Sequence, residues 1–424
     1  MIKIIKDSAM YRDFLFGVTE KKVDVSKVVS EIIEKVKKDG DSALYYYAEK
    51  FDKVKLSSLE VTKEEIDEAV AKVDKEFLAV LERAAENIRA FHKEQKREGF
   101  ELKREEGVIV GQKVIPVERA GLYVPGGTAA YPSTVLMDAI PAKIAGVEEV
   151  AIVTPPDKEG KVNPVILAAA SVAGVDRIYK VGGAQAIAAL AYGTKTIKKV
   201  DKIVGPGNAF VAEAKKQVFG AVSIDMIAGP SEILIVADKL NNPKHIAADL
   251  LSQAEHDKMA SAVLITDNFE FASAVSEEIE KQIPMLERAE IARVSIDDNG
   301  KIIVVKNLDE AIDVANLIAP EHLELCLDNP FEYLKKIKHA GSVFLGRNCP
   351  EALGDYFAGT NHTLPTSGTA RFSSPLSVDD FIKKTQYIYY DENALKKASK
   401  DVELFAKKEG LTAHAKSAVI RCED

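Results

Sequence analysis

From Val147 to Gly220 the chain alternates short apolar segments with helix-like segments, and this rhythm limits the fold more than any other feature. VEEVAIVTPP, DRIYKVGG and VDKIVGPGN predict strands that leave through proline or glycine turns, while NPVILAAASVAG, AQAIAALAYG and AFVAEAKKQVFG predict helices. Strand, helix and strand in this order form right-handed βαβ units. A second series, from SEILIVAD to GSVFLG, has the same grammar. The sequence therefore predicts an α/β protein with two parallel sheets.

The two ends of the chain depart from this rhythm. Residues 25–49 and 63–93 carry apolar side chains at three- and four-residue spacing, which predicts helices, and VIVGQKVIPVERAGLYVPGG predicts extended segments. Beyond Gly346, GTNHTLPTSGTARFSSP predicts a loop. The last fifty residues predict a strand, KKTQYIYY, and two helices separated by Gly410. So few residues do not bury a core of their own, so we expect them to pack on another surface.

Charge and cysteine usage bound the environment and the partners. The formal net charge is −9 and no dense Lys/Arg block occurs, so we expect neither nucleic acid nor an anionic membrane as a partner. The three cysteines are scattered, which is typical of a reducing compartment. The N-terminal segment has no long apolar stretch of a signal peptide, and no apolar run is long enough to span a bilayer. We expect a cytoplasmic protein.

Two glycine turns follow predicted strands and open predicted helices. One contains Gly182 and Gly183, and the other is the GPGN segment that ends at Asn208. Such turns present free backbone N–H groups and the positive end of a helix dipole, which suits a nucleotide phosphate. Neither matches the usual dinucleotide or P-loop motif. A plain strand-to-helix turn, with Asn208 as the helix N-cap, is the alternative at this point.

Metal ligation is one interpretation of LLSQAEHDK. Gln253 and His256 lie three residues apart near a predicted helix end and hence on one face, where a zinc ion can bind; a polar helix end is the alternative. Asp355 in GDYFAG reads as a turn residue. Glu409 and His414 are separated by the break at Gly410, which lets both point at one target, although a solvated helix surface explains them as well.

Glu321 and His322 stand side by side at the start of the predicted strand HLELCL. Such a pair can be an ion pair at a sheet rim, or a general base next to a carboxylate that activates water. The remaining histidines divide into two groups. His362 lies in a hydroxyl-rich loop, where it contacts a substrate or stabilises a turn, and the others are expected at the surface: His92, His245 and His339.

Taken together, these segments resemble one enzyme family. PEH, QAEHD, GPGN, AGPSE, GLYVPGG, GTNHTLPTSGTAR and EGLTAH resemble the motifs of histidinol dehydrogenase, over nearly the whole chain. Ser261 departs from the pattern, because the family more often has Gln there. The resemblance implies an enzyme that oxidises L-histidinol to L-histidine, the last step of histidine biosynthesis, in two NAD-dependent steps through L-histidinaldehyde.

The resemblance also implies a role for individual residues. Glu321 and His322 would be the catalytic acid–base pair, with Glu321 activating water for the second oxidation. The implied zinc ligands are Gln253, His256, Asp355 and His414. The implied NAD contacts are Tyr123, Gln185 and Asn208. The implied substrate contacts are Ser231, Gln253, His256, His322, Asp355, Glu409 and His414. Zinc would anchor the imidazole and amine of the substrate.

The family architecture implies two incomplete Rossmann-like domains and a homodimer. The expected parts are an N-terminal arm (1–17), a discontinuous first domain (18–124 and 232–372), a second domain (125–231) and a tail (373–424) that reaches the partner subunit. The active sites would therefore be shared between subunits.

Two other function classes share parts of these motifs. A zinc hydrolase would use Glu321 as general base toward a metal-bound water and would need no NAD. A non-catalytic α/β protein would use the glycine turns to bind a nucleotide. Formation of reduced nicotinamide from histidinol separates the three.

Overall fold

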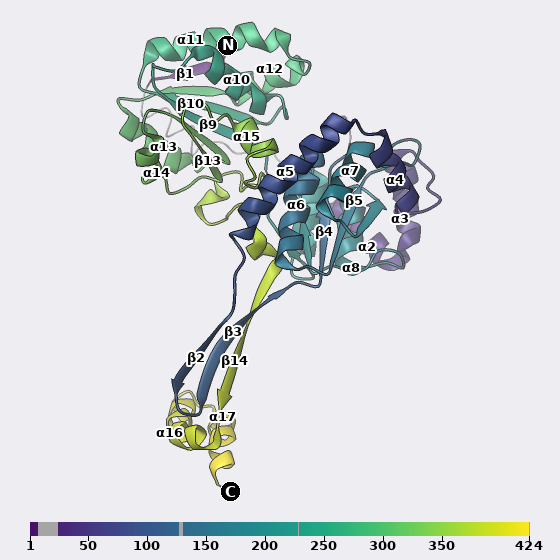
Figure 1. The fold of residues 1–424 in the computed structure, drawn as a ribbon, viewed down its shortest axis with the longest axis vertical. Helices are drawn as coiled ribbons and strands as arrows, with labels where there is room; N and C mark the ends of the chain where they lie inside the picture. The colour runs from purple at the N-terminus through teal and green to yellow at the C-terminus, as the bar shows by residue number, and fades with distance from the viewer. Residues whose placement is uncertain (7–23, 127–129, 228, 424) are drawn as a thin grey trace. The chain divides into compact units, whose positions relative to one another are not determined.

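The computed structural model describes residues 1–6, 24–126, 130–227 and 229–423. The chain divides into two compact units (Figure 1): Met1–Gln95 with Glu118–Phe381, and Lys96–Val117 with Ile382–Asp424. The first unit contains two parallel sheets and the second contains a small antiparallel sheet, which confirms the predicted fold class. Among the described residues, no helix is both long and apolar enough to cross a membrane.

The larger sheet has the strand order β1-β11-β10-β9-β12-β13, with parallel pairing throughout. Its strands are β1 (Lys3–Ile5), β9 (Glu232–Ala237), β10 (Ser261–Thr266), β11 (Lys301–Val304), β12 (His322–Cys326) and β13 (Ser342–Leu345). Its helices are α10 (Pro243–Ala254), α11 (Phe269–Gln282), α12 (Ala289–Asp298), α13 (Leu308–Ile318), α14 (Pro330–Leu334) and α15 (Glu351–Tyr356). Ile233 and Ile235 of β9 join one apolar core, and Leu234 and Val236 join another, because successive strand residues point to opposite faces. Both faces of this sheet are therefore covered.

The smaller parallel sheet has the order β6-β5-β4-β7-β8. Its strands are β4 (Arg119–Tyr123), β5 (Glu149–Thr154), β6 (Arg177–Lys180), β7 (Lys202–Val204) and β8 (Ser223–Ile224). Its connecting helices are α6 (Pro132–Ala145), α7 (Pro164–Ala173), α8 (Gly183–Tyr192) and α9 (Ala209–Val218). The strand order reverses between β4 and β7, so the carboxyl ends of these two strands form the switch point at which open α/β sheets bind ligands.

The N-terminal helices are α2 (Ser26–Asp39), α3 (Asp41–Tyr47), α4 (Lys63–Lys72) and α5 (Lys75–Lys93), with a π-helical turn at Ala48–Asp52. The two predicted helical segments are confirmed, each interrupted once, at Gly40 and at Val73. α2 packs on α8 and α9 beside the smaller sheet, while Asn87 of α5 donates to the carbonyl of Phe357 at 2.8 Å. The N-terminal helices thus contact elements that belong to both parallel sheets. The predicted domain boundaries stay a prediction. Of the predicted arm, 7–17 lie outside the described residues.

The second unit is a three-stranded antiparallel sheet in the order β14-β3-β2 followed by two helices. Its elements are β2 (Phe100–Glu105), β3 (Val108–Pro116), β14 (Ile382–Tyr390), α16 (Glu392–Lys408) and α17 (Thr412–Val419). The predicted final strand and the two helices separated by Gly410 are confirmed; the hairpin partner β2 was not predicted. Every residue of β2 is exposed, and Ile388 and Phe405 are 74% and 70% exposed. This unit buries little apolar surface of its own.

Candidate active site

The Glu321–His322 pair lies at the amino edge of the larger sheet. α13 ends at Ile318, and Ala319 adopts a left-handed conformation (φ 54°) that turns the chain into β12, whose first residue is His322. The predicted position at the start of a strand is therefore confirmed. The pair is 6% and 4% exposed, so its surroundings, rather than bulk water, determine its protonation.

The backbone of Glu232, at the start of β9, holds both side chains of the pair. Its N–H donates to Oε2 of Glu321 at 2.8 Å, and its carbonyl oxygen lies 2.9 Å from Nδ1 of His322. A carbonyl oxygen only accepts, so Nδ1 carries the imidazole proton. The lone pair of the neutral ring is therefore on Nε2, which makes Nε2 the basic atom.

Two carboxylates of α15 face this basic atom. Nε2 of His322 lies 3.7 Å from Oε1 of Glu351 and 3.7 Å from Oδ1 of Asp355, and the three atoms lie within 4.8 Å of one another. Glu351 was missed by the sequence analysis. Its signal is the four-residue spacing from Asp355, which places both on one face once 351–356 is known to be helical.

The prediction that Asp355 is a turn residue was wrong. It lies in α15, and the neighbouring Gly354 serves close packing rather than a turn, because an added Cβ would meet the ring of Phe344 at 2.7 Å. Glu351 lies in the first turn of α15, where a negative charge interacts favourably with the helix dipole. Gly354 was therefore misinterpreted as a turn signal, whereas its lack of a side chain lets α15 pack against Phe344 of β13.

Burial and mutual charge shift the site's titration. Burial raises the pKa of Glu321 to about 7, although the neighbouring His322 acts in the opposite direction. Burial alone would lower the pKa of His322, but the carboxylates of Glu321, Asp355 and Glu351 outweigh it and raise that pKa to about 10 while no cation neutralises them. Nε2 is therefore available as a base once a bound cation offsets these negative charges. Three carboxylates around one imidazole make this a site for cations and for positively charged substrate groups.

Within the described residues, one cluster has metal-binding geometry, His322, Glu351 and Asp355, and of these Asp355 is a predicted zinc ligand. Oε1 of Gln253, Nε2 of His322 and Oε1 of Glu351 are buried without a hydrogen-bond partner in the described part of the chain. Burial lowers the pKa of His256, although the negative charge of Asp355 acts in the opposite direction. A lowered pKa favours the neutral imidazole, which is the form that binds a metal ion. Buried polar atoms without a partner are costly unless a ligand binds them.

The histidines outside the pair differ from expectation in one case. His92 is fully buried and not at the surface; its Nδ1 lies 2.7 Å from Oε1 of Gln95. Its position on the inner face of the amphipathic α5 explains this. His245 is exposed and His339 half-buried. Nδ1 of His362 lies 3.9 Å from Oδ1 of Asp355, so its loop borders the carboxylate cluster.

The predicted NAD contacts lie at the carboxyl edge of the smaller sheet. Tyr123 ends β4, and its hydroxyl oxygen accepts the Gly183 N–H at 3.0 Å. Gln185 is buried in the first turn of α8. Asn208 caps α9, with its side-chain oxygen accepting the N–H groups of Phe210 and Val211. Tyr123 ends β4 and Asn208 follows β7, the two strands that flank the switch point, while Gln185 follows β6.

The other predicted substrate contacts are more dispersed. Ser231 is half-buried and directly precedes β9, beside Glu232. Glu409 and His414 belong to the second unit, where both are exposed at the break between α16 and α17. Their predicted roles are not tested by the geometry of the first unit.

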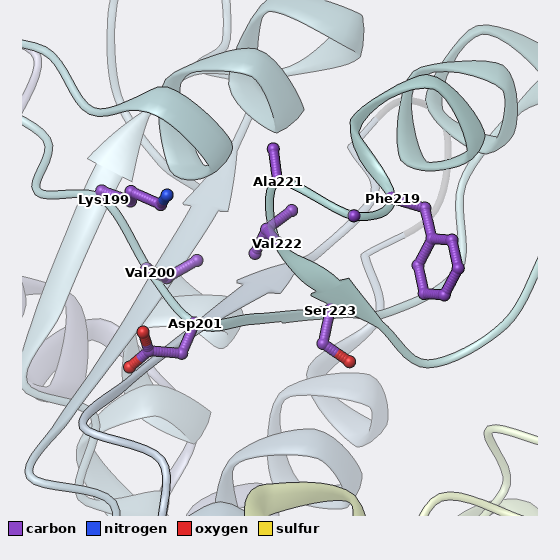
Figure 2. Close-up of a pocket in the computed structure, with 8 residues that line it drawn as sticks. Lys199, Val200, Asp201, Phe219, Ala221, Val222 and Ser223 are labelled. Atoms are coloured by element: carbon purple, nitrogen blue, oxygen red, sulfur yellow. The ribbon is translucent and has the colours of Figure 1, made fainter. Parts of the chain in front are cut away.

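A surface pocket of about 340 Å³ lies elsewhere, at the amino end of β7 and β8 (Figure 2). The described residues that line it are Lys199, Val200, Asp201, Phe219, Gly220, Ala221, Val222 and Ser223, and none is a predicted site residue. Oδ2 of Asp201 already accepts the N–H groups of Glu118 and Arg119. This pocket presents no catalytic group comparable to the His322 cluster.

Comparison with known proteins identifies the family of this chain. The family model described as histidinol dehydrogenase matches residues 18–422. Histidinol dehydrogenase of Clostridium acetobutylicum is 55% identical over 426 residues, 99% of each chain, and that of Bacillus cereus is 56% identical over 400 residues, 94% of this chain and 93% of the other. The crystal structure of the Elizabethkingia anophelis enzyme superposes with a TM-score of 0.95 at 40% identity, covering 100% of this chain and 98% of that one. The chain belongs to the histidinol dehydrogenase family.

Proposed function

We propose that Glu321 and His322 carry the proton transfers of a two-step oxidation of L-histidinol to L-histidine. Histidinol dehydrogenase activity, the last step of histidine biosynthesis, follows from family membership, and the family uses NAD and zinc. The two alternatives, a zinc hydrolase and a non-catalytic binding protein, are set aside on the same ground. The observation that supports the pair's role is the double hydrogen bond to Glu232, which leaves Nε2 of His322 as the base.

The pair would act in sequence. Nε2 of His322 takes the hydroxyl proton of histidinol, and Nδ1 keeps its proton on the Glu232 carbonyl. The surrounding carboxylates stabilise the imidazolium that forms. NAD, when bound, accepts the hydride in each step. Glu321 then removes a proton from the water that adds to the aldehyde, while Nε2 of His322 returns its proton to the aldehyde oxygen. The base regenerated in this way deprotonates the resulting hydrate in the second oxidation.

Gln253, His256 and Asp355, with His414, are the residues we propose to hold zinc. Zinc, when bound, would orient the substrate through its imidazole and amine. The unpaired oxygen of Gln253 and the neutral imidazole of His256 support this set. Ser231 and Glu409 complete the proposed substrate contacts, and Tyr123, Gln185 and Asn208 the proposed NAD contacts.

We further propose a cytoplasmic homodimer in which the second unit serves the partner's active site. That unit exposes large apolar side chains, including Ile388 and Phe405. Exposed apolar patches often bind another protein, which supports contact with a partner subunit. Glu409 and His414 are exposed on the same unit, as residues that complete another subunit's site would be.

The stoichiometry of product formation tests the two-step reaction. Purified enzyme with limiting histidinol and excess NAD should form two NADH per histidinol, read from absorbance, with histidine as the final product. One NADH per histidinol, with free aldehyde accumulating, would contradict a second oxidation at this site.

A further inference from the structure

A buried ion pair lies beside the Gly205–Asn208 turn. It joins Lys215 of α9 to Asp225, the residue after β8, and their side chains are 3% and 1% exposed. The pair holds both backbone polar groups of Gly205. The Gly205 N–H donates to Oδ2 of Asp225 at 2.8 Å, and Nζ of Lys215 donates to the Gly205 carbonyl at 3.0 Å.

Gly205 needs such partners because of where it lies. β7 ends at Val204, so the ladder bonds of the sheet stop while the backbone is still buried. Gly205 has φ 114°, and an added Cβ would lie 2.2 Å from the carbonyl oxygen of Tyr123. Unpaired backbone groups here would be costly. The ion pair therefore maintains a backbone conformation that the sheet itself does not impose.

Fold stability alone does not explain a charged pair at this position. A buried ion pair contributes little net stability, and apolar side chains of similar volume usually serve as well. Apolar side chains cannot bond the N–H and carbonyl of Gly205, however. What the pair supplies is the orientation of the turn that leads to Asn208 and the N-terminus of α9.

We propose that Lys215 and Asp225 are positioning residues for NAD: through the backbone of Gly205 they set the turn against Tyr123 so that Asn208, at the N-terminus of α9, faces the cofactor. This inference rests on the NAD site of the proposed function. It adds two buried residues that are not among the proposed direct NAD contacts.

A second set of buried polar contacts joins α6 to the loop beside the catalytic cluster. Asp138 of α6 is fully buried, and its Oδ1 accepts the hydroxyl of Thr363 at 2.9 Å. Asn361 donates to the Met137 carbonyl at 2.6 Å. α6 is thus bonded to the loop that contains His362, and the charge of Asp225 reaches Asp138.

The test compares folding with cofactor affinity. Lys215→Met and Asp225→Asn each leave one buried partner unpaired and should lower the unfolding temperature. The double variant removes both charges and should regain part of that stability. Because the Gly205 carbonyl stays without its donor, the Kd for NAD, measured by calorimetry, should remain about tenfold above wild type. Zinc content and histidinol affinity should not change.

A matched control is the Lys202–Asp380 pair at the opposite end of β7, with Nζ and Oδ1 3.2 Å apart and Lys202 similarly buried. Lys202→Met with Asp380→Asn should leave the Kd for NAD unchanged. A wild-type Kd in the folded Lys215/Asp225 double variant overturns the inference. If that variant does not fold, Lys215→Arg keeps the charge but moves the donor, and an unchanged Kd there overturns it equally.

Two further variants separate this failure from failure of the NAD site. Tyr123→Phe and Asn208→Ala alter proposed direct contacts. If neither changes the Kd for NAD, the proposed cofactor site is wrong. If both weaken NAD binding while the Lys215/Asp225 variants do not, the site stands and only the positioning role is lost.

Discussion

At the scale of single residues, Glu321 and His322 share the backbone of Glu232 but have different tasks in the proposal. Only oxidation of the aldehyde consumes water. Glu321→Gln should therefore slow oxidation of supplied histidinaldehyde about 100-fold or more and affect alcohol oxidation much less. His322→Ala should slow both. Single-turnover measurement of each half-reaction is the check, and equal losses in both halves for Glu321→Gln would exclude a water-activating role.

Asp138 provides a residue-scale prediction about stability. Burial raises its pKa to about 8, with a further contribution from Asp225, against 3.8 for an ordinary Asp. Between these values the folded state holds a proton that the unfolded state has lost. The free energy of unfolding should therefore fall as pH rises from about 4 to 8, by at most about 1.4 kcal/mol per pH unit.

Asp138→Asn removes this titration while keeping an acceptor for Thr363. Urea unfolding at pH 5 and pH 8 should show a smaller loss of stability for the variant than for the wild type. An identical loss in both proteins would mean that Asp138 is ionised in the folded state.

At the scale of elements, α10 offers a comparison within one helix. Its end brings Gln253 and His256 to the amino edge of the sheet, while His245 lies exposed in its first turn. His256→Ala should lose bound zinc and turnover, whereas His245→Ala should keep both. Metal analysis of the two purified variants, together with chelation and zinc titration of the wild type, is the measurement. Full zinc content in His256→Ala would remove that residue from the ligand set.

At the scale of the whole molecule, the second unit decides whether sites are shared. His322→Ala damages the first unit and His414→Ala the second. If the second unit serves the partner, a mixed dimer has one site with both intact residues and one with both lesions. Random pairing makes about half the dimers mixed, so about a quarter of wild-type activity should return when the two inactive variants are refolded together.

The same experiment has a clear opposite outcome. If each second unit completes its own subunit's site, every site keeps one lesion and no activity returns. Confirmation of mixed dimers by native mass spectrometry makes that outcome decisive, and wild-type protein refolded in parallel controls for losses in refolding.

Local periodicity in the sequence was enough to predict the helices and strands of the two parallel sheets. The alternation between Val147 and Gly220 and the apolar stretch after His322 report whether a segment is helix or strand, and both sheets followed from them. Glycine misled at Gly354, where it packs against Phe344. A glycine can serve a turn or a close contact, and the sequence does not distinguish the two. His92 was misread for a related reason, since an amphipathic helix can bury a polar residue when a partner is available.

The sequence by itself determined the family, the α/β class and the start of β12 at His322, because motifs and periods are properties of neighbouring residues. Only the tertiary structure decided that the backbone of Glu232, about ninety positions away, bonds Glu321 and His322. It also decided that Glu351 lies with Asp355 beside Nε2 of His322. The same holds for Lys215 and Asp225, which bond the backbone of Gly205. These contacts depend on strand order and on helices returning to the sheet edge. Such long-range pairings leave no period in the chain, so no local pattern reports them.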